Sequence, residues 1–504
     1  MTTLLSASQS TQLGPRRRWA ALAVLMFPVL LVSVDNTALS FAVPSLSRDL
    51  APTGNQLLWI IDVYPLVLAA LLITMGSLGD RIGRRRILLM GGTGFAAVSA
   101  LAAFAPDANS LIAARALLGV FGAMLMPATL SLIRNIFTDA SERRMAVAIW
   151  AAGFSGGAAL GPLVGGWLLE HFWWGSVFLI AVPVLLPLLV LGPILLPESR
   201  DPNPGPVDLR GIALASLALG SLVFAIKSVA EQPLVALAAV IVGATALAAF
   251  VSRMLTTRQP MLDVRLFGNA VFSGALLVNL VSVVAMVGFI YFATQYLQLV
   301  AGLSPLTAAW LLVPGLVLTV AAGMIAVPLV RRIGSRRVVM AGLAFNAAGY
   351  AVMAVFGHTG SLTVVLLAFG VLSIGVGMSE TISNDLALSA VPEDKAGAAA
   401  AASETAYEVG AVLGTALLGS LLNLAYRNGL EVPAGISADA ADEARSTLGG
   451  AFEVATDLPT ATADALVDSA VRAFDGGVTW TAGIGFLLSL AALVIARRAL
   501  RASD

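Results

Sequence analysis

Several charged side chains stand inside long apolar runs of this sequence, and five of them are candidates for a functional role. Asp35, Asp62, Glu404 and Glu408 are carboxylic acids, and Arg115 is a permanent cation. Such groups are costly in an apolar setting, so a functional role is the default interpretation. A carboxylate there can take up a proton or a cationic ligand, and an arginine can hold a carboxylate in place. The residues therefore predict reversible binding of protons and cations.

Glu404 and Glu408 are four residues apart, which places both on one face of a helix near the membrane midplane. Two carboxylates that face one cavity repel each other when both are ionised, so at least one is expected to hold a proton near neutral pH. We expect a cation to displace that proton. Glu380 and Asp385 are interpreted as mostly structural.

The other three charged residues are predicted to lie at similar depths in the membrane. A rise of about 1.5 Å per residue places Asp35, Asp62 and Arg115 at similar height in the outer half of the membrane. We therefore expect a contact of Arg115 with Asp35 or with Asp62. Two alternatives stay open: Arg115 extends to the outer interface, and Asp62 is an interfacial residue near a helix start.

The elements that carry these groups are predicted to be transmembrane helices, and the fold class is all-α. The chain has 504 residues, 58% of them hydrophobic and 12% charged, whereas soluble domains carry about 25% charged residues. An N-terminal signal peptide is the alternative for the first run, but thirteen further runs follow it. The fourteen predicted spans are 19–43, 57–78, 87–105, 110–133, 145–168, 175–196, 209–229, 233–252, 270–298, 305–330, 338–357, 361–383, 397–424 and 476–496.

The composition excludes several classes of function. Basic and acidic residues number 29 each, so the basic surplus of a nucleic-acid-binding protein is missing. There is no cysteine and there are two histidines, so we expect no metal site. Neither Lys227 nor Lys395 follows a glycine, so no phosphate-binding loop is present. We expect no cofactor. Unless a partner subunit supplies an ATPase, the energy must come from an ion gradient or from the solute's own gradient.

The arginines and lysines indicate the orientation. With fourteen spans and a cytoplasmic N-terminus, 23 of the 29 basic residues fall on the cytoplasmic side, in agreement with the positive-inside rule. Both termini are then cytoplasmic. Arginine heavily outnumbers lysine and alanine is abundant, which suggests a bacterium with a GC-rich genome and places the protein in the bacterial inner (plasma) membrane.

An internal repeat divides the chain. Residues 80–86 and 331–337 share a basic, glycine-containing pattern at an offset of 251 residues, which predicts six spans, two inserted spans and six more. Chance similarity of two basic loops is the alternative. The predicted parts are a cytoplasmic tail 1–18, an N-terminal half 19–200, an inserted pair 201–265 and a C-terminal half 266–504.

The segment 425–475 is expected to be external. It contains nine acidic residues and three arginines. Leu466, Val467, Ala470, Val471 and Phe474 recur at helical spacing and predict an amphipathic helix. A solvated, poorly ordered loop is the alternative.

A glycine-rich basic loop follows the second span. Its glycines permit a tight connection between helices, its aspartate can accept from arginines, and its arginines hold the loop at the anionic inner surface. The pattern resembles the cytoplasmic loop signature of the major facilitator superfamily, which implies a gating role for Gly76, Asp80, Arg81, Gly83 and Arg84. The second copy has Arg331 where Asp80 would align, so equivalent gating of the two halves is not assumed.

The fifth span carries a glycine every four residues, a spacing that forms a groove for close helix packing. The glycines are Gly153, Gly157, Gly161 and Gly165, and Pro162 predicts a kink. This stretch resembles the motif of exporters in the same superfamily. Arg115, with the glycines and proline after it, resembles the superfamily's intramembrane arginine motif.

Nearly the whole chain resembles the fourteen-span drug:proton antiporters of that superfamily. The resemblance implies a non-enzymatic exporter of lipophilic, mostly cationic drugs and dyes, and we expect a monomer in the lipid bilayer. Aromatic side chains could supply cation–π contacts to such substrates, with packing as the alternative; the candidates are Tyr64, Phe292, Tyr296 and Tyr407. Other readings are a narrow-substrate exporter of an antibiotic, siderophore or lipid, and a non-transporting membrane receptor.

Overall fold

The computed structural model describes residues 14–503 apart from 201–207, 230–231, 258–259, 261 and 392–395. Among the described residues, thirteen helices are long and apolar enough to cross a membrane. The other predicted span corresponds to α3 (Arg84–Ala102), which is less apolar because it begins with three arginines. The remaining spans involve α1 (Pro15–Asp49), α2 (Gly54–Ile82), α4 (Ala108–Ile136), α5 (Ala140–His171), α6 (Ser176–Leu179) with α7 (Ala181–Leu195), α8 (Leu209–Ser228), α9 (Pro233–Thr256), α10 (Ala270–Gln295) with η2 (Tyr296–Val300), α11 (Pro305–Ile333), α12 (Ser335–Phe356), α13 (Leu362–Ser389), α14 (Ala396–Leu413) with η5 (Gly414–Gly419) and α15 (Ser420–Gly429), and α18 (Thr460–Ala499).

Several predicted boundaries change. Helix α1 begins at Pro15, so Arg16, Arg17 and Arg18 belong to its first turns and not to a tail. A proline is favourable at this position because its missing N–H would have no helical partner. Most of the predicted tail, residues 1–13, and part of the loop before the inserted pair, 201–207, lie outside the described residues.

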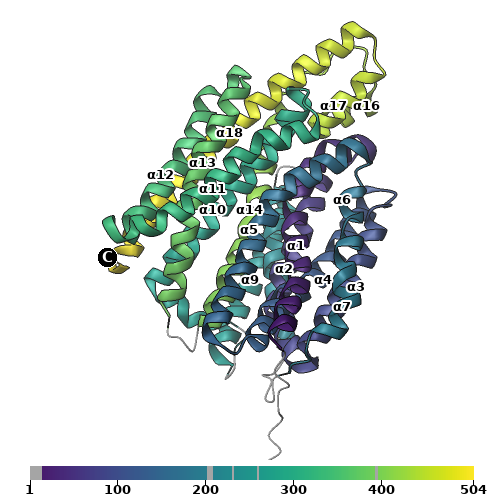
Figure 1. The fold of residues 1–504 in the computed structure, drawn as a ribbon. Coiled ribbons are helices and arrows are strands. Elements are labelled where there is room, and N and C mark those ends of the chain that lie inside the picture. The colour runs from purple at the N-terminus through teal and green to yellow at the C-terminus, as the bar shows by residue number, and fades with distance from the viewer. Residues whose placement is uncertain are drawn as a thin grey trace, which may run out of the picture.

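The two halves repeat one packing scheme. In the N-terminal half α1 packs on α5 and α7, and α4 packs on α2 and α3. In the C-terminal half α10 packs on α14 and α18, and α13 packs on α11 and α12. Figure 1 shows the halves side by side, the first in purple to blue and the second in green to yellow. The internal repeat is thus visible in helix packing as well as in the two basic loops.

The repeated loops are built on glycines with positive φ. Gly83 joins α2 to α3 at a φ of 116°, and Gly334 joins α11 to α12 at a φ of 88°. Side chains disfavour this backbone region, so glycine allows each pair of helices to turn without an intervening loop. The glycine is common to both copies although the aspartate is not.

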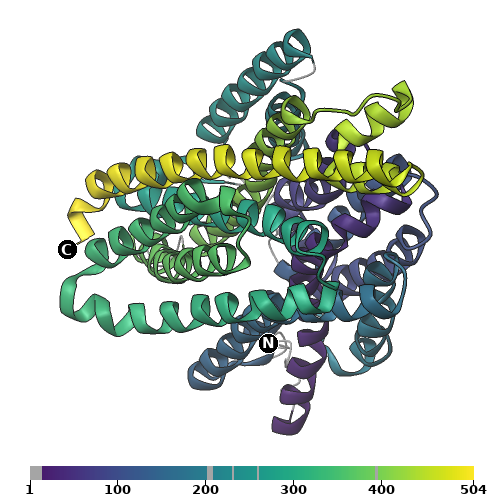
Figure 2. The same ribbon diagram turned by 90° about the horizontal axis from the view of Figure 1, so that it is seen from above.

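The inserted helices α8 and α9 lie at the edge of the bundle (Figure 2). They pack chiefly on each other, and α8 also contacts α2 and η5. Arg253 of α9 donates to both carboxylate oxygens of Asp208, at 2.8 Å each. Asp208 also caps the start of α8 by accepting from the backbone N–H of Gly211. This residue therefore fixes the two helices to each other at one end.

The segment 425–475, expected from the sequence to be external, is largely helical. Helices α16 (Ala438–Ser446) and α17 (Leu448–Thr456) precede α18, which is 40 residues long and starts inside the segment. Leu466, Ala470 and Phe474 are buried in an apolar cluster of the C-terminal half. The predicted amphipathic helix is confirmed, and the alternative of a poorly ordered loop is wrong. Figure 1 shows α16 and α17 together at one end of the molecule.

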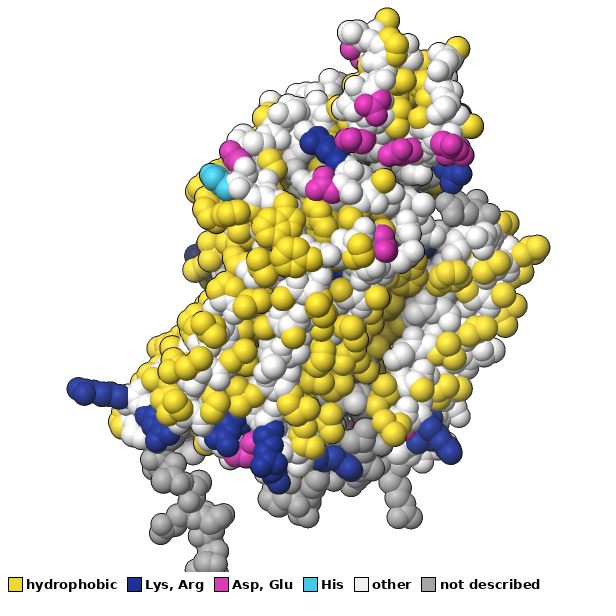
Figure 3. All heavy atoms as spheres, turned by 90° about the vertical axis from the view of Figure 1, so that its right-hand side faces the viewer, with side chains coloured by type: hydrophobic (Ala, Val, Ile, Leu, Met, Phe, Trp, Pro, Cys, Tyr) yellow, Lys and Arg dark blue, Asp and Glu magenta, His cyan; other side chains and the backbone are white. Residues whose placement is uncertain are grey.

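Charge separates along the long axis. On the face drawn in Figure 3, most arginines and lysines gather at one end and most acidic side chains at the other. Near the acidic end the two halves touch: Gln298 Nε2 donates to the Phe41 carbonyl at 3.1 Å, and the Ser304 hydroxyl donates to Glu170 at 3.2 Å. These two hydrogen bonds join the halves near the acidic end.

Candidate functional site

A buried ion pair joins α4 to α1. Arg115 Nη1 donates to Asp35 Oδ2 at 2.8 Å, and Arg115 Nε donates to the Ile60 carbonyl at 3.1 Å. The two side chains are 2% and 6% exposed. The guanidinium lies 4.4 Å from the centre of the Tyr64 ring. Of the two contacts expected for Arg115, the structure has the one with Asp35. The burial of the Arg115 side chain is inconsistent with its extension to the outer interface.

Asp62 has a different partner. Its Oδ2 lies 2.8 Å from Nζ of Lys227, on the inserted helix α8, and the two side chains are 1% and 0% exposed. The Lys227 ammonium also lies 4.2 Å from the centre of the Trp59 ring. Asp62 is therefore a buried residue and not an interfacial one. Sequence reasoning assigned no role to Lys227; the available signal was a lysine within an apolar span.

Three carboxylates gather where α13 and α14 meet. Glu408 is buried, while Glu404 and Glu380 are half-buried. Glu404 is close enough to interact electrostatically with both Glu408 and Glu380. Glu408 Oε2 has no hydrogen-bond partner among the described residues. Glu380, interpreted from the sequence as mostly structural, is thus part of the same acidic cluster as the two predicted residues.

Tyr407 neighbours this cluster and also contacts the other half. It interacts electrostatically with all three carboxylates, and its ring meets the Phe154 ring of α5 edge-on, with centroids 6.4 Å apart. The acidic cluster therefore borders the interface between the halves.

The other aromatic candidates are packed. Tyr64 is buried against Arg115 and Phe95. Phe292 packs against Phe289 in the core of the C-terminal half, with centroids 4.5 Å apart and ring planes tilted by 51°. The Tyr296 hydroxyl donates to the Gly360 carbonyl at 2.6 Å. The structure thus separates Phe292 and Tyr296 from the acidic cluster, and packing accounts for both.

The glycine motif of α5 faces α1. A Cβ at Gly157 would lie 2.9 Å from Ser33 Cβ, and one at Gly165 would lie 3.0 Å from Ala38 Cβ. Gly153 faces Met26, and Gly161 faces Thr37 and the Val34 carbonyl. Helix α5 runs through Pro162 without interruption. These glycines bring α5 close to the turn of α1 that carries Asp35.

The basic loop after α2 is tied to the end of α7. Within the loop, Asp80 accepts from Arg84 Nε at 2.9 Å. Glu198, beyond α7, accepts from the backbone N–H of Arg85 at 3.1 Å. A Cβ at Gly83 would lie 2.6 Å from Glu198 Oε1, whereas one at Gly76 would lie 3.4 Å from Pro127 Cβ. Arg81 has partners as well. The loop thus joins α2, α3 and α7.

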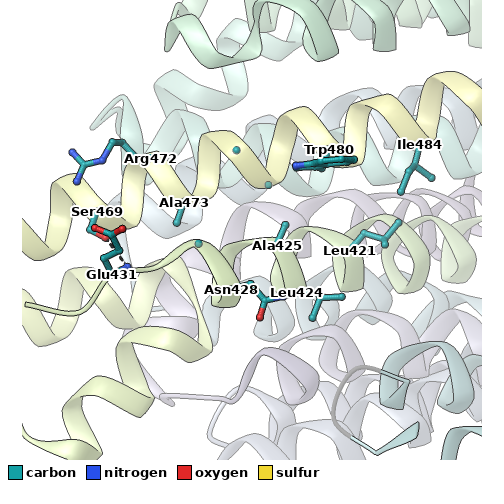
Figure 4. A pocket seen from close by; sticks show the side chains of 13 residues that line it. Leu421, Leu424, Ala425, Asn428, Glu431, Ser469, Arg472, Ala473, Trp480 and Ile484 are labelled. Atoms are coloured by element: carbon teal, nitrogen blue, oxygen red, sulfur yellow. Dashed lines mark hydrogen bonds between the residues drawn. The ribbon is translucent and has the colours of Figure 1, made fainter.

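A groove of about 630 Å³ lies between α15 and α18. Its floor is apolar, with Leu421, Leu424 and Ile484, and Trp480 lies along one side (Figure 4). Glu431 and Arg472 mark its polar end, where the Glu431 backbone N–H donates to the Ser469 hydroxyl at 2.9 Å. The groove belongs to the C-terminal half alone, apart from the acidic cluster.

Two six-helix halves that enclose buried ion pairs and carboxylates define the class of protein: a multi-pass membrane transporter. The model of the major facilitator superfamily matches residues 25–415, and the chain belongs to this superfamily.

Relatives with known names agree with this assignment. The chain is 53% identical to the multidrug efflux pump LfrA of Mycolicibacterium smegmatis, over 99% of this chain and 100% of that protein. It is 38% identical to the methyl viologen resistance protein SmvA of Salmonella typhimurium, over 91% and 93%. A bacterial homolog of the human lysosomal transporter Spinster, inward-facing and unoccupied, has the same fold, with a TM-score of 0.68 and 17% identity over 97% and 99%.

Proposed function

We propose that the protein is a proton-coupled antiporter that exports lipophilic, mostly cationic drugs and dyes. The names of its relatives, a multidrug efflux pump and a methyl viologen resistance protein, support drug export. Methyl viologen is itself an organic cation. The observation that carries the proton coupling is the acidic cluster: Glu408 is buried beside Glu404 and has an oxygen without a hydrogen-bond partner among the described residues.

Exchange follows from charge balance at that cluster. Neighbouring carboxylates, one of them buried, cannot all remain ionised without a counter-charge, so either protons or a bound cation must neutralise them. A cation that arrives from the cytoplasm or the inner leaflet displaces a proton from Glu404 or Glu408. The halves then rock to expose the site outward, and external protons release the cation. Asp35, held by Arg115, is the second proton-responsive group.

The proposed orientation places the basic end in the cytoplasm, with both termini on that side, in a bacterial inner membrane. Excess arginine at one end of the bundle supports it (Figure 3). The proposed cycle needs no cofactor, because the proton gradient supplies the energy. A monomer is sufficient for it.

The direct test is the accumulation of a fluorescent cation in everted vesicles with and without a pH gradient. Accumulation that depends on the gradient is expected for the wild type and is expected to fail in Glu404→Gln, Glu408→Gln and Asp35→Asn. The matched control is Asp385→Asn, because Asp385 is an exposed residue on α13. Full gradient-driven transport by all three variants would contradict the proposal.

A narrower substrate range remains the alternative within the transporter class. The acidic cluster favours cations but does not define breadth. A panel of structurally unrelated cations separates the two readings: export of several supports a multidrug exporter, and export of one supports the narrow reading.

A further inference from the structure

Lys227 occupies an unusual position for a lysine. It belongs to α8, which lies at the edge of the bundle, yet its side chain is 0% exposed. The side chain points away from lipid and ends at Asp62 of α2, in the N-terminal half. Neither the proposed transport cycle nor the superfamily motifs noted in the sequence make use of this residue.

The surroundings of its ammonium group form a cation site. Asp62 Oδ2 supplies a negative charge 2.8 Å from Nζ, and the Trp59 ring supplies a π-face 4.2 Å from it. A carboxylate and an aromatic face are the two features that bind organic ammonium ligands. Phe224 of α8 extends the aromatic wall, with its ring centroid 6.5 Å from that of Trp59.

The site lies where the three parts of the chain meet. Beside it, Leu66 of α2, Val223 of α8, and Val412 and Ala416 of the C-terminal half form one apolar cluster. A group that moves here therefore affects the contacts between the inserted pair and both halves.

We propose that Lys227 is a tethered counter-cation, and that an organic cation competes with its ammonium group for the site formed by Asp62 and Trp59. The inference rests on the proposed function, because it supplies the ligand class. A single carboxylate neutralises one positive charge. A second cation beside Lys227 would be buried without a counter-charge, which is strongly unfavourable. Ligand binding therefore requires Lys227 to withdraw.

The alternative is a permanent ion pair that only anchors α8. The two readings differ in what happens when the lysine charge is removed. If Lys227 competes with the ligand, removal of its charge should make the site bind cations more tightly. If Lys227 only anchors α8, removal of its charge should leave cation binding unchanged or weaker.

The first experiment measures ethidium binding to the purified full-length protein in detergent by fluorescence. Lys227→Met keeps the apolar length of the side chain and removes its charge, and we expect a dissociation constant about tenfold lower than that of the wild type. Lys227→Arg, which keeps the charge, should bind like the wild type. Adding Asp62→Asn to Lys227→Met should abolish the gain. Unchanged or weaker binding by folded Lys227→Met would overturn the inference.

The second experiment uses the wild-type chain and does not depend on how a variant folds. Lys227 and Lys395 are the only lysines in the sequence, so ¹⁵N-lysine labelling gives two ammonium signals, and Lys395→Arg assigns them. Ethidium is expected to shift the Lys227 signal and leave the Lys395 signal in place. A wild type that transports ethidium but shows no Lys227 shift contradicts this inference alone, whereas a wild type that neither binds nor transports any cation contradicts the proposed function.

Discussion

Arg115 holds the carboxylate of Asp35 at 2.8 Å from one side of α1, while the glycines of α5 approach the same helix at Val34 and Thr37. Two motifs that are far apart in the sequence therefore converge on one turn of α1. One supplies a counter-charge and the other supplies close packing. The Arg115 charge and the packing of α5 together set the position of Asp35. The exporter-type glycine motif therefore helps to position a buried charge.

Asp35→Asn is expected to destabilise the protein strongly. The substitution leaves the Arg115 charge buried and uncompensated, and removal of one partner from a buried pair typically costs about 3–5 kcal/mol. The readout is the thermal unfolding midpoint of the purified protein, with Asp49→Asn as the matched control, because Asp49 is an exposed residue on the same helix. Adding Arg115→Gln should recover part of the loss. Equal midpoints for the two single variants would contradict the prediction.

Gly161→Ala is expected to separate α5 from α1. The new Cβ would meet Thr37 and lie 3.0 Å from the Val34 carbonyl oxygen, and overpacking of this kind costs about 1–3 kcal/mol. We expect a lower unfolding midpoint and loss of efflux. Gly156→Ala is the internal control: it lies on the same helix, and a Cβ there has no atom within 4 Å. Gly156→Ala should not lower the midpoint, because alanine favours the helix more than glycine does. A defect of similar size in both variants would therefore contradict the prediction.

Much of this architecture was predictable from hydropathy and charge. Apolar runs predict the membrane-spanning helices well because the bilayer requires every backbone polar group to be paired within the helix. The arginine-rich loops predict their direction, which stays a prediction. Depth counting also brought Asp35 and Arg115 to the same height, since helical rise is constant. It could not choose between Asp35 and Asp62 as the partner of Arg115, because that choice depends on how each helix is rotated about its axis.

Asp208→Asn is expected to weaken the inserted pair in a pH-dependent way. Arg253 donates hydrogen bonds to Asp208 and holds the pKa of this carboxyl below its ordinary value. The stabilisation is therefore complete above the ordinary pKa of an aspartate and is lost as the pH falls through the lowered pKa. Because the Arg253 side chain is 34% exposed, solvent screening should keep the effect small.

The measurement is the difference in unfolding midpoint between the wild type and Asp208→Asn, followed from neutral pH into the acid range. The difference should be present at neutral pH and vanish in acid, and Arg253→Gln should behave in the same way. A difference that stays constant across the range would mean that the ion pair is not its source.

The partner of Asp62 was harder to anticipate. Lys227 is distant in sequence and lies on an inserted helix. Because that helix is largely apolar, its sequence does not indicate which of its faces contacts the bundle. Glu380 presents the same difficulty. Its place near the end of a predicted span favoured a structural role, and only the packing of α13 against α14 brings it beside Glu404.

Glu380→Gln is expected to impair the export of dications more than that of monocations. A dication needs two negative charges to be neutralised. Because one carboxylate of Glu380, Glu404 and Glu408 is expected to hold a proton, the cluster supplies two charges in the wild type and one in this variant. That one charge still neutralises a monocation. We expect efflux of methyl viologen to fall about tenfold, equivalent to about 1.4 kcal/mol, while efflux of ethidium falls about twofold or less.

Both cations are to be measured in the same cells, with expression and unfolding midpoints matched to the wild type. Asp385→Asn is the control, because it removes a carboxylate from an exposed position on the same helix. If Glu380 acts only by supporting the fold, both cations should be lost in equal proportion, since a loosened helix pair does not distinguish their charges. A selective loss of the dication would therefore assign Glu380 to the cation site, because charge is the property that separates the two substrates there.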